Sequence, residues 1–596
     1  MAGGAKVEKR SIMWFRKGLR LHDNPALHKS CQDASHVFPL FVLDPFFLAP
    51  DPTAPSPGSR TVGVNRIQFL LESLRDLNAS LESRGSKLLL VQGNPVEVLP
   101  ELIEKWSINR LCFEFDTEPY AQDRDQQIKE ICDHRGVEVH TPVSHTLFDP
   151  REVIAKNGGK PPLTYQAFCR KLGNPPKPLD DATVKVPAPP GDLKDVKVVP
   201  VPSLEDLGYV DLKEDFTPFR GGETEGLKRL EESLANKKWV SEFEKPKGDP
   251  TAFLKPATTC LSPYFKFGCV SARLFYSRLL AVYAESKKHT QPPVSLEGQM
   301  LWREFFYTAG YGTPNFDRMV GNPICKQIPW KDDENLLSCW RDGRTGYPWI
   351  DAAMIQLRKW GWLHHLARHA VACFLTRGDL FVYWEKGRDV FDRLLVDSDW
   401  ALNNGNWMWL SASAFFAQYH RIYSPITFAK KYDPDGKYIK HFIPALKDMP
   451  KAYIYEPWTA PLSVQKQANC IIGKDYPKPV VDHAIANKKC RDRMGAAYAL
   501  NKQAAPGQPT QEQVNTLNNK LTANLEGEAD EQDVAAATDS GEDSSPSLKP
   551  KVKRQRKLPF QKKGGPAATE SGEENSPPSP KPKVTRQRKL PFQKKG

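Results

Sequence analysis

Residues 11–15 read Ser-Ile-Met-Trp-Phe, and three more short apolar runs follow: Val37-Phe-Pro-Leu-Phe-Val-Leu43, Lys87-Leu-Leu-Leu-Val91 and Arg110-Leu-Cys-Phe-Glu-Phe115. Between the second and third runs, residues 64–81 carry leucine and isoleucine at helical spacing. Strands that alternate with helices are typical of a parallel, doubly wound sheet. We therefore expect an α/β domain over residues 8–140.

A doubly wound sheet binds small ligands beyond the carboxyl ends of its strands. Neither G-x-G-x-x-G nor G-x-x-x-x-G-K-S/T occurs in this region. The usual dinucleotide and triphosphate sites are therefore not predicted in the α/β domain.

The rest of the chain divides into three parts. Residues 141–217 are predicted to be an inter-domain linker, because prolines crowd residues 172–202 and hydrophobic periodicity is lost. Residues 218–500 show helical patterning with many aromatic residues, which predicts an all-α domain. Residues 501–596 are polar, charged and poor in aromatics, which predicts a disordered tail. Within this basic tail, residues 554–564 recur as residues 586–596.

Charge and cysteine usage narrow the class of protein. The tail from Ala505 holds 16 Lys and Arg against 12 Asp and Glu, so +4 of the net charge of +13 lies there and +9 in the folded body. A basic body favours a polyanionic partner. No apolar run reaches the roughly 18 residues that a membrane span requires, and no secretory signal is predicted. Eleven cysteines without a C-x-x-C pair indicate reduced thiols inside the cell.

The segment Trp360-Gly-Trp-Leu-His-His-Leu-Ala-Arg-His369 places His365 and His369 on one face of a predicted helix, with Arg368 beside them. Three interpretations compete. A metal site lacks the glutamate of H-E-x-x-H and would have a cation next to its ligands, so metal binding is not predicted. A proton-transfer pair suits imidazoles at neutral pH, and a nearby negative cofactor would favour protonation of one of them. A hydrogen-bonded core cluster is the third.

Trp330, Trp384 and Trp407 lie in aromatic segments that a helical domain could align. Indole is the most easily oxidised protein side chain, so such a series could carry an electron hole to the surface. Ordinary core packing is the alternative, because the chain has 14 tryptophans.

Three polar segments indicate a ligand in the helical domain. Asp397-Ser-Asp-Trp-Ala-Leu-Asn-Asn-Gly-Asn-Trp-Met-Trp409 would be costly to bury without a partner rich in hydrogen-bonding groups; a solvated loop is the alternative. Gln299-Met-Leu-Trp-Arg-Glu304 adds a guanidinium suited to phosphate. Thr258-Thr-Cys-Leu-Ser262 is typical of a helix start that receives phosphate. Together they indicate a dinucleotide in a helical pocket.

Five segments carry a family resemblance. They are residues 14–27, Thr258-Thr-Cys-Leu-Ser-Pro-Tyr-Phe-Lys-Phe-Gly268, Leu301-Trp-Arg-Glu-Phe-Phe306, Gly346-Tyr-Pro-Trp-Ile-Asp351 and Asn403-Asn-Gly-Asn-Trp-Met-Trp409. The chain closely resembles the photolyase/cryptochrome family over residues 8–500, above all the branch of (6-4) photolyases and animal-type cryptochromes. The tail lies outside the resemblance.

The resemblance implies an α/β domain for an optional antenna chromophore (deazaflavin, folate or FMN) and an all-α domain that binds FAD. By the resemblance, Arg368 pairs with Asp397, Asp399 meets the isoalloxazine edge and Asn403 meets N5. The electron-transfer series would run from Trp407 through Trp384 to Trp330. The pyrophosphate would lie near Thr258, Thr259, Leu261, Ser262 and Arg303.

The resemblance also assigns a lesion. Gln299, His365 and His369 stand where photolyases of cyclobutane dimers usually carry Glu, Asn and Met. Reversal of a (6-4) adduct moves a proton and an oxygen between bases and so needs a general acid. His365, protonated, would donate that proton with support from His369 and Tyr423. The flipped-out lesion would be positioned by Gln299, Trp302 and Trp409.

Two functions compete within the family. The first is light-driven repair of (6-4) photoproducts in duplex DNA; the second is blue-light signalling or clock repression, and dual activity is compatible with the sequence. Phe381 stands where many animal-type members have a fourth oxidisable aromatic, which favours repair. The repeated basic motif predicts nuclear import and a nuclear location, and its leucine and phenylalanine weakly suggest a replication-clamp or signalling partner.

Overall fold

The structure is a computed structural model that describes residues 8–49, 61–180, 185–209, 217–253 and 256–523. In this part of the chain, no helix is long and apolar enough to cross a membrane. The eleven cysteines all lie here and none forms a disulfide.

The N-terminal domain is built on five parallel strands in the order β3-β2-β1-β4-β5. All four apolar runs predicted as strands form strands. The fifth is a three-residue strand too short to leave a pattern. The strands are β1 (Lys9–Phe15), β2 (Ala34–Leu43), β3 (Leu89–Gln92), β4 (Arg110–Cys112) and β5 (Glu138–His140).

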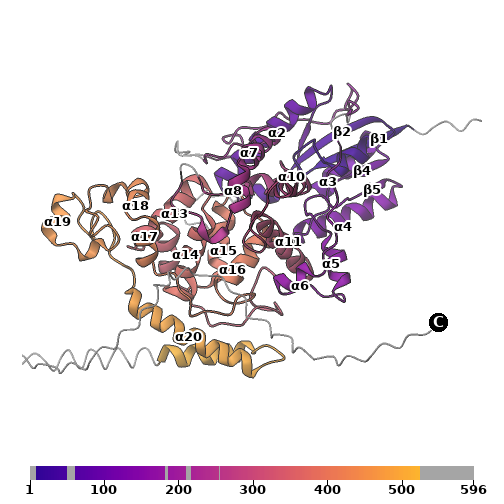
Figure 1. The fold of residues 1–596 in the computed structure, drawn as a ribbon. Helices are drawn as coiled ribbons and strands as arrows, with labels where there is room; N and C mark the ends of the chain where they lie inside the picture. Colours follow the sequence, from indigo (N-terminus) through magenta and orange to yellow (C-terminus); the bar gives the residue numbers. More distant parts are fainter. Residues whose placement is uncertain (1–7, 50–60, 181–184, 210–216, 254–255, 524–596) are drawn as a thin grey trace, which may run out of the picture. The chain divides into compact units, whose positions relative to one another are not determined.

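The sheet buries both faces, as the continuous apolar strands predict. Ile12 and Trp14 point to the side covered by α3 (Pro95–Lys105) and α4 (Pro119–His134), whereas Met13 and Phe15 point to the side of α1 (Pro25–Cys31) and α2 (Val64–Glu82). Figure 1 shows α2, α3 and α4 beside the strands. The predicted doubly wound sheet is confirmed.

The segment between the domains is more structured than a simple linker. It contains α5 (Pro150–Lys156) and α6 (Tyr165–Cys169). Its proline-rich part has no helix or strand in the described residues, yet it is tied to the sheet. The backbone N–H of Val37 donates to the carbonyl of Pro187 at 3.2 Å, and that of Val199 donates to the carbonyl of Leu90 at 2.9 Å.

The rest of the described chain is helical, as predicted (Figure 1). Short 3-10 turns and one π-helical turn, η3 (Phe374–Gly378), interrupt it. The α-helices are α7 (Glu223–Ala235), α8 (Lys237–Glu242), α9 (Ser262–Lys266), α10 (Ala272–Ala284), α11 (Leu296–Gly312), α12 (Glu334–Arg341), α13 (Pro348–Trp360), α14 (His365–Cys373), α15 (Trp384–Leu394), α16 (Trp400–Leu410), α17 (Thr427–Tyr432), α18 (Lys437–Phe442), α19 (Leu462–Gln467) and α20 (His483–Gln503).

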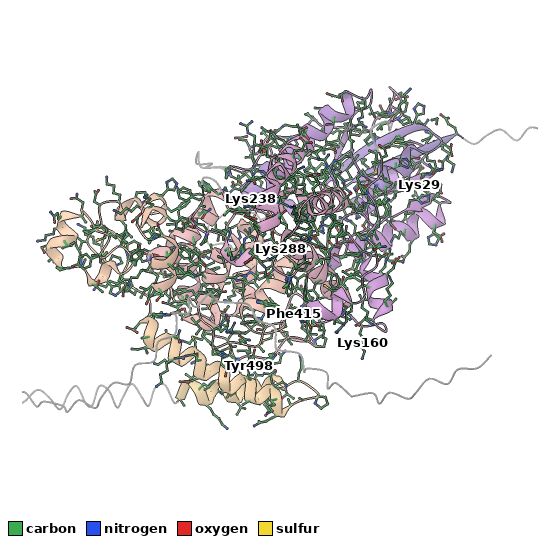
Figure 2. The ribbon with its side chains drawn as sticks, in the orientation of Figure 1. Lys29, Lys160, Lys238, Lys288, Phe415 and Tyr498 are labelled. Atoms are coloured by element: carbon green, nitrogen blue, oxygen red, sulfur yellow. The ribbon has the colours of Figure 1, made fainter. Side chains whose placement is uncertain are left out.

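The ordered part extends beyond residue 500, where the sequence predicts the tail to begin. Helix α20 continues to Gln503, and residues 511–523 are also helical. Val514 is buried and Leu517 packs against the helical core, so one apolar face holds this segment. Tyr498 on α20 donates a hydrogen bond to the carbonyl of Ala412 at 2.6 Å (Figure 2). The repeated basic motif lies outside the described residues.

Candidate functional site

The histidine pair is set by a tight turn between two helices. Gly361 ends α13 with a φ of +66°, a conformation that glycine adopts without strain. His364 then caps α14 by accepting the N–H of Leu366 at 3.3 Å. His365 is the first residue of α14, and the ring of His369 lies one turn further on, 6.0 Å from it between centroids. The two imidazoles share one face, as their spacing predicts.

The two rings are half-buried and their surroundings are cationic. His365 hydrogen-bonds the backbone of Lys245, and its Nε2 is buried without a partner among the described residues. Burial, the nearby His364 and the cation of Lys245 lower the pKa of His365 well below 6.5. Burial and the same lysine lower the pKa of His369 to about 3. Both rings are neutral at pH 7 in this state, so protonation requires an added negative charge.

The hydroxyl of Tyr423, on a separate segment, lies close to His369. It is 3.3 Å from the Nδ1 of His369, and Tyr423 is the residue predicted to support this ring. Lys245, by contrast, was not predicted, because it lies in a short 3-10 turn (Lys245–Lys247) whose sequence resembles any exposed basic turn. Only the folded chain places it against α14.

Arg368 forms the predicted ion pair. Its Nη2 donates to Asp397 Oδ2 at 2.8 Å, and its Nε donates to the carbonyl of Leu363 at 2.9 Å. The other oxygen of Asp397, Oδ1, is buried with no hydrogen-bond partner in the described structure. A buried carboxylate oxygen without a donor is costly and indicates a ligand N–H or O–H at that point.

Asp399 faces a different way from Asp397. It caps α16: Oδ1 accepts the N–H of Leu402 at 3.2 Å and Oδ2 accepts the hydroxyl of Tyr307. Burial beside Asp399 raises the pKa of Tyr307 well above its usual value, so the phenol stays protonated and donates. Asn403, one turn along, donates from Nδ2 to the carbonyl of Arg388 at 3.0 Å.

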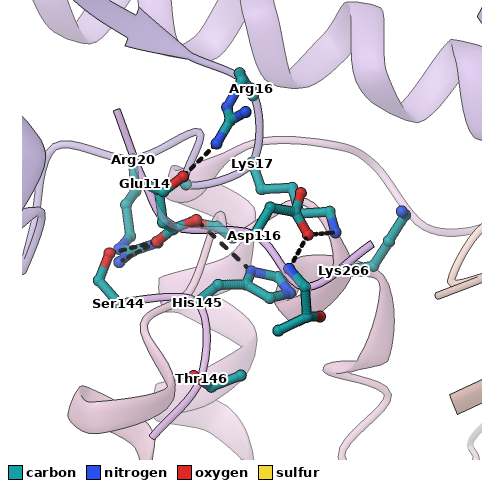
Figure 3. Close-up of polar contacts among 12 residues, drawn as sticks. Arg16, Lys17, Arg20, Glu114, Asp116, Ser144, His145, Thr146 and Lys266 are labelled. Carbon is teal, nitrogen blue, oxygen red and sulfur yellow. Dashed lines mark hydrogen bonds and ion pairs between the residues drawn. The ribbon is translucent and has the colours of Figure 1, made fainter. Parts of the chain in front are cut away.

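A buried polar network continues from Asp399 into the N-terminal domain, where Figure 3 shows Glu114, Ser144 and His145. His145 Nε2 hydrogen-bonds the hydroxyl of Tyr307 at 2.7 Å, and its other nitrogen lies 3.7 Å from Glu114. Glu114 follows β4 and also accepts the hydroxyl of Ser144. Burial and surrounding cations lower the pKa of His145 well below its usual value, so it is neutral. The sequence did not mark this network, since each member is an isolated polar residue in its own segment.

The residues predicted to approach a pyrophosphate occupy two places. Ser262 starts α9 after the buried Leu261, with Thr258 and Thr259 half-buried just before it. Arg303 on α11 is buried, and it donates to Glu304 at 2.6 Å and to the carbonyl of His145 at 2.9 Å. These two contacts already use donors of Arg303, and its phosphate role remains a prediction.

Half-buried aromatic rings form an array near the start of α11 and the end of α16. Trp302 stacks on Tyr165 with 4.5 Å between centroids, and Trp409 meets Trp302 edge-on at 5.2 Å. Phe416 stacks on Trp409 at 5.6 Å, and its neighbour Phe415 is labelled in Figure 2. Half-buried rings in a row give flat apolar surface suited to unstacked bases. Gln299, also half-buried, lies one turn before Arg303 on α11.

The three predicted electron-transfer tryptophans share one hydrophobic core. Trp407 and Trp384 are fully buried, whereas Trp330 keeps 8% of its surface exposed. Trp407 also contacts Trp340 edge-on at 6.1 Å. Trp340 was not predicted, because one more tryptophan in an aromatic segment gives no signal of its own.

Comparison with known proteins covers both domains. Residues 11–189 match the DNA photolyase family and residues 295–496 match the FAD binding domain of DNA photolyase. The chain is 64% identical to a (6-4)DNA photolyase of Oryza sativa subsp. japonica, covering 83% of this chain and 90% of that protein. It is 62% identical to a (6-4)DNA photolyase of Arabidopsis thaliana, covering 86% and 92%. The chain belongs to the photolyase/cryptochrome family.

More distant relatives include cryptochromes and solved structures. A cryptochrome-1 of Gallus gallus is 49% identical, over 82% of this chain and 78% of that protein. The crystal structure of a Synechocystis cryptochrome aligns with a TM-score of 0.72 at 25% identity, covering 82% of this chain and all of that one. An archaeal photolyase from Sulfolobus tokodaii, solved with two FAD molecules, aligns with a TM-score of 0.64 at 26% identity, covering 82% and 99%.

The donor set of this photolyase/cryptochrome chain fits a flavin. Arg368 presents donors and the unpartnered Oδ1 of Asp397 presents an acceptor at the same place. A donor beside an acceptor is complementary to the carbonyl and N–H of an imide, which is the polar edge of an isoalloxazine. Asp397 is therefore the carboxylate with an oxygen to offer, whereas both oxygens of Asp399 are engaged within the protein.

We expect His365 and His369 to stay neutral in the ligand-free protein. Their imidazole C–H resonances should not titrate between about pH 5.5 and 8, unlike an ordinary histidine with a pKa near 6.5. Below about pH 6.5 the unfolded chain takes up a proton on each histidine and the folded chain does not. The free energy of unfolding should therefore fall as the pH drops below about 6.5. NMR titration, assigned with His365→Gln and His369→Gln, tests this; titration of either ring near 6.5 contradicts it.

Proposed function

We propose that this photolyase/cryptochrome chain is a light-dependent (6-4) DNA photolyase that uses reduced FAD. The observation that carries the proposal is the half-buried pair His365 and His369 beside Tyr423, in a chain more than 60% identical to two named (6-4)DNA photolyases. An imidazole pair supplies the general acid that this lesion needs and a cyclobutane dimer does not.

The bound flavin supplies, under light, the electron that opens the lesion. The protein's part begins with position: Arg368 and Asp397 would hold the imide edge, and Asn403 on α16 would face N5. The array of Trp302 and Trp409 receives the flipped-out bases on flat apolar surface. Basic residues outside the pocket hold phosphates without reading sequence.

His365 is the general acid, and its proton is gained only when the site fills. Burial, His364 and Lys245 by themselves keep the ring neutral. The negative charges of a reduced cofactor and of the lesion's phosphates reverse this balance, which raises the pKa of the imidazole and lets Nε2 carry a proton to the lesion. His369 and the hydroxyl of Tyr423 hold the donor in place.

Reduction of the cofactor uses the tryptophan series. Trp407 and Trp384 are buried and Trp330 reaches the surface, so an electron passes inward from Trp330 while the hole moves outward. The buried interior prevents water from quenching the two inner rings. Phe381, which contacts Trp330, is too hard to oxidise and ends the series there.

A signalling role is the second candidate, favoured by the similarity to cryptochrome-1 of Gallus gallus. The histidine pair does not exclude it. The distinction lies in the reaction: a repair enzyme restores both bases, and a receptor without repair activity leaves the lesion intact.

His365→Ala should bind FAD and lose at least about 100-fold in repair rate, because general acid catalysis contributes about 10²–10⁴. The substrate is an oligonucleotide with one (6-4) lesion, given to photoreduced protein under light, with restored bases counted by chromatography. Arg358→Gln, an exposed change on α13, is the matched control. Repair near the normal rate in His365→Ala overturns the assignment, and no repair by the wild-type holoenzyme overturns the function.

We also propose an antenna site at the carboxyl end of β2. Phe46 and Phe47 are 54% and 39% exposed, and Phe46 stacks on Tyr120 with 3.9 Å between centroids. Tyr120 donates to Asp44 at 2.6 Å, and the guanidinium of Arg124 lies over its ring at 5.4 Å. Exposed rings with a cation and a carboxylate suit a planar chromophore such as a deazaflavin, folate or FMN.

Arg124→Gln with Phe46→Ala should remove the antenna and leave the flavin. We expect the purified double variant to lose any absorption band beyond that of FAD, and to keep its FAD content and its repair yield under light absorbed by flavin alone. A second chromophore retained at wild-type stoichiometry would place the antenna elsewhere.

The tail is proposed to direct the protein to the nucleus through the basic motif at residues 554–564 and 586–596. Because residues 511–523 pack on the helical domain, the informative truncation ends at residue 523. Repair by the truncated enzyme in vitro should be unchanged, and a fluorescent fusion should shift from nucleus to cytoplasm. An unchanged nuclear signal would contradict the role of the motif.

A further inference from the structure

A pocket outside the flavin region borders the outermost tryptophan. Its volume is about 300 Å³, and it lies between residues 379–381 and the first three turns of α20. Lys331 and Leu336 complete the wall. Neither the histidine pair nor the Arg368–Asp397 pair belongs to it.

The wall next to Trp330 is held in an unfavourable backbone conformation. Phe381 has a φ of +57°, which a bulky residue adopts only when its surroundings impose it. It follows the π-helical turn η3, in which Thr376 leaves helical geometry. The reason is visible in its contacts: the ring lies 4.7 Å from Trp330 between centroids, with the guanidinium of Arg493 over it at 5.2 Å. Such strain is concentrated at functional sites.

The pocket is basic and its cations lack acidic partners. Arg493 is only 5% exposed, and its Nη1 is buried with no hydrogen-bond partner in the described chain. Lys331 and Lys489 line the same pocket, and neither forms an ion pair with a described acidic side chain. Burial lowers the pKa of both Lys331 and Arg493. A bound anion would offset the unfavourable free energy of burying these three unpaired positive charges.

The two acids at the pocket form no ion pair with its cations in the described chain. Asp379 pairs with His483 at 2.5 Å through Oδ1, and its Oδ2 is buried with no hydrogen-bond partner in the described residues. Asp482 caps α20 by accepting the N–H of Ile485 at 3.0 Å.

The remaining lining is apolar. Leu336, Phe381 and Val481 form the walls, and Ile485 stands at the rim with 58% of its surface exposed. An apolar cavity with a cationic rim is complementary to a small aromatic body with one negative group. The ring of Phe381 offers a stacking face, and the volume accommodates a molecule of one ring and a short acidic side chain.

The position of the pocket indicates what the occupant does. Trp330 is 8% exposed and meets the pocket through the ring of Phe381, so an occupant lies one ring away from it. Electron transfer weakens steeply with distance, which makes a bound donor here more effective than one that collides with the small exposed edge of Trp330. A phenol that loses its proton to water as it gives up an electron can reduce an oxidised indole.

We propose that this pocket binds a phenolic aromatic carboxylate, which gives one electron to oxidised Trp330. The carboxylate meets Arg493 and the lysines, and the ring stacks on Phe381. One electron leaves the phenol and restores the indole, the phenol O–H bond breaks and its proton passes to solvent water. The phenoxyl radical then departs. The inference rests on the proposed role of Trp330 in reduction of the flavin.

The test uses two matched probes with the full-length, FAD-loaded protein. 4-Hydroxycinnamate carries the phenol and cinnamate does not, so both should bind and compete with submillimolar dissociation constants measured by calorimetry. Under blue light, only 4-hydroxycinnamate should accelerate accumulation of reduced flavin, at least fivefold, with a saturating concentration dependence. A rate that rises linearly without saturation, or equal acceleration by cinnamate, overturns the proposal.

Variants separate the pocket from a collision. Ile485→Trp fills the cavity and Arg493→Gln removes the cation; each should weaken binding of both probes at least tenfold and abolish the saturable acceleration. Arg491→Gln, exposed on the same helix, is the matched control and should behave as wild type. Reduction by dithionite and repair by the reduced enzyme should be unchanged in all three. Wild-type binding in both pocket variants overturns the site.

Trp330→Phe distinguishes this inference from the function beneath it. It should bind both probes as wild type does and lose the acceleration. If the variant is photoreduced as fast as wild type in the presence of 4-hydroxycinnamate, the electron does not pass through Trp330 and the proposed donation step is wrong. Repair of the (6-4) oligonucleotide by reduced enzyme tests the proposed function independently of this result.

Discussion

The carboxylate of Asp399 at the start of α16 is the contact on which the arrangement of the site depends. One oxygen caps α16 and the other accepts the hydroxyl of Tyr307 on α11, which in turn bonds His145 from the inter-domain segment. Three segments distant in sequence thus meet at one buried anion. Because a buried charge is tolerated only when its hydrogen bonds are satisfied, the geometry of all three is closely specified.

That constraint explains how neighbouring acids take different tasks. Asp397 and Asp399 are two residues apart. Asp397 pairs with Arg368 and has one oxygen without a partner in the described chain, whereas both oxygens of Asp399 accept hydrogen bonds within the protein. The same α16 carries Asn403 and Trp407. Fixing the capping residue of α16 therefore positions both Asn403, which we propose faces the flavin, and Trp407, the proposed first member of the electron-transfer series.

Charge also sets the chemistry of the histidines. Cations and burial make His365 and His369 weak bases, so under the proposed mechanism the acid form requires the negative charge of the cofactor and the lesion. A general acid that forms only in the filled site avoids a buried, unpaired positive charge at other times. The basic pocket beside Trp330 is a second place where charge points to a ligand. Its cations have no acidic partners in the described chain, and this is the basis for proposing that an anion binds there.

The amino-acid sequence alone determined the two-domain architecture, the strands of residues 11–15 and 37–43, and the shared face of His365 and His369, because these follow from local periodicity. Family likeness supplied the Arg368–Asp397 pair, which the structure contains. Tertiary structure alone decided which groups surround them. Lys245, Tyr307, His145 and Arg493 each lie in an unremarkable segment, and their roles arise from burial and from contacts between residues far apart in the chain, which no local pattern encodes.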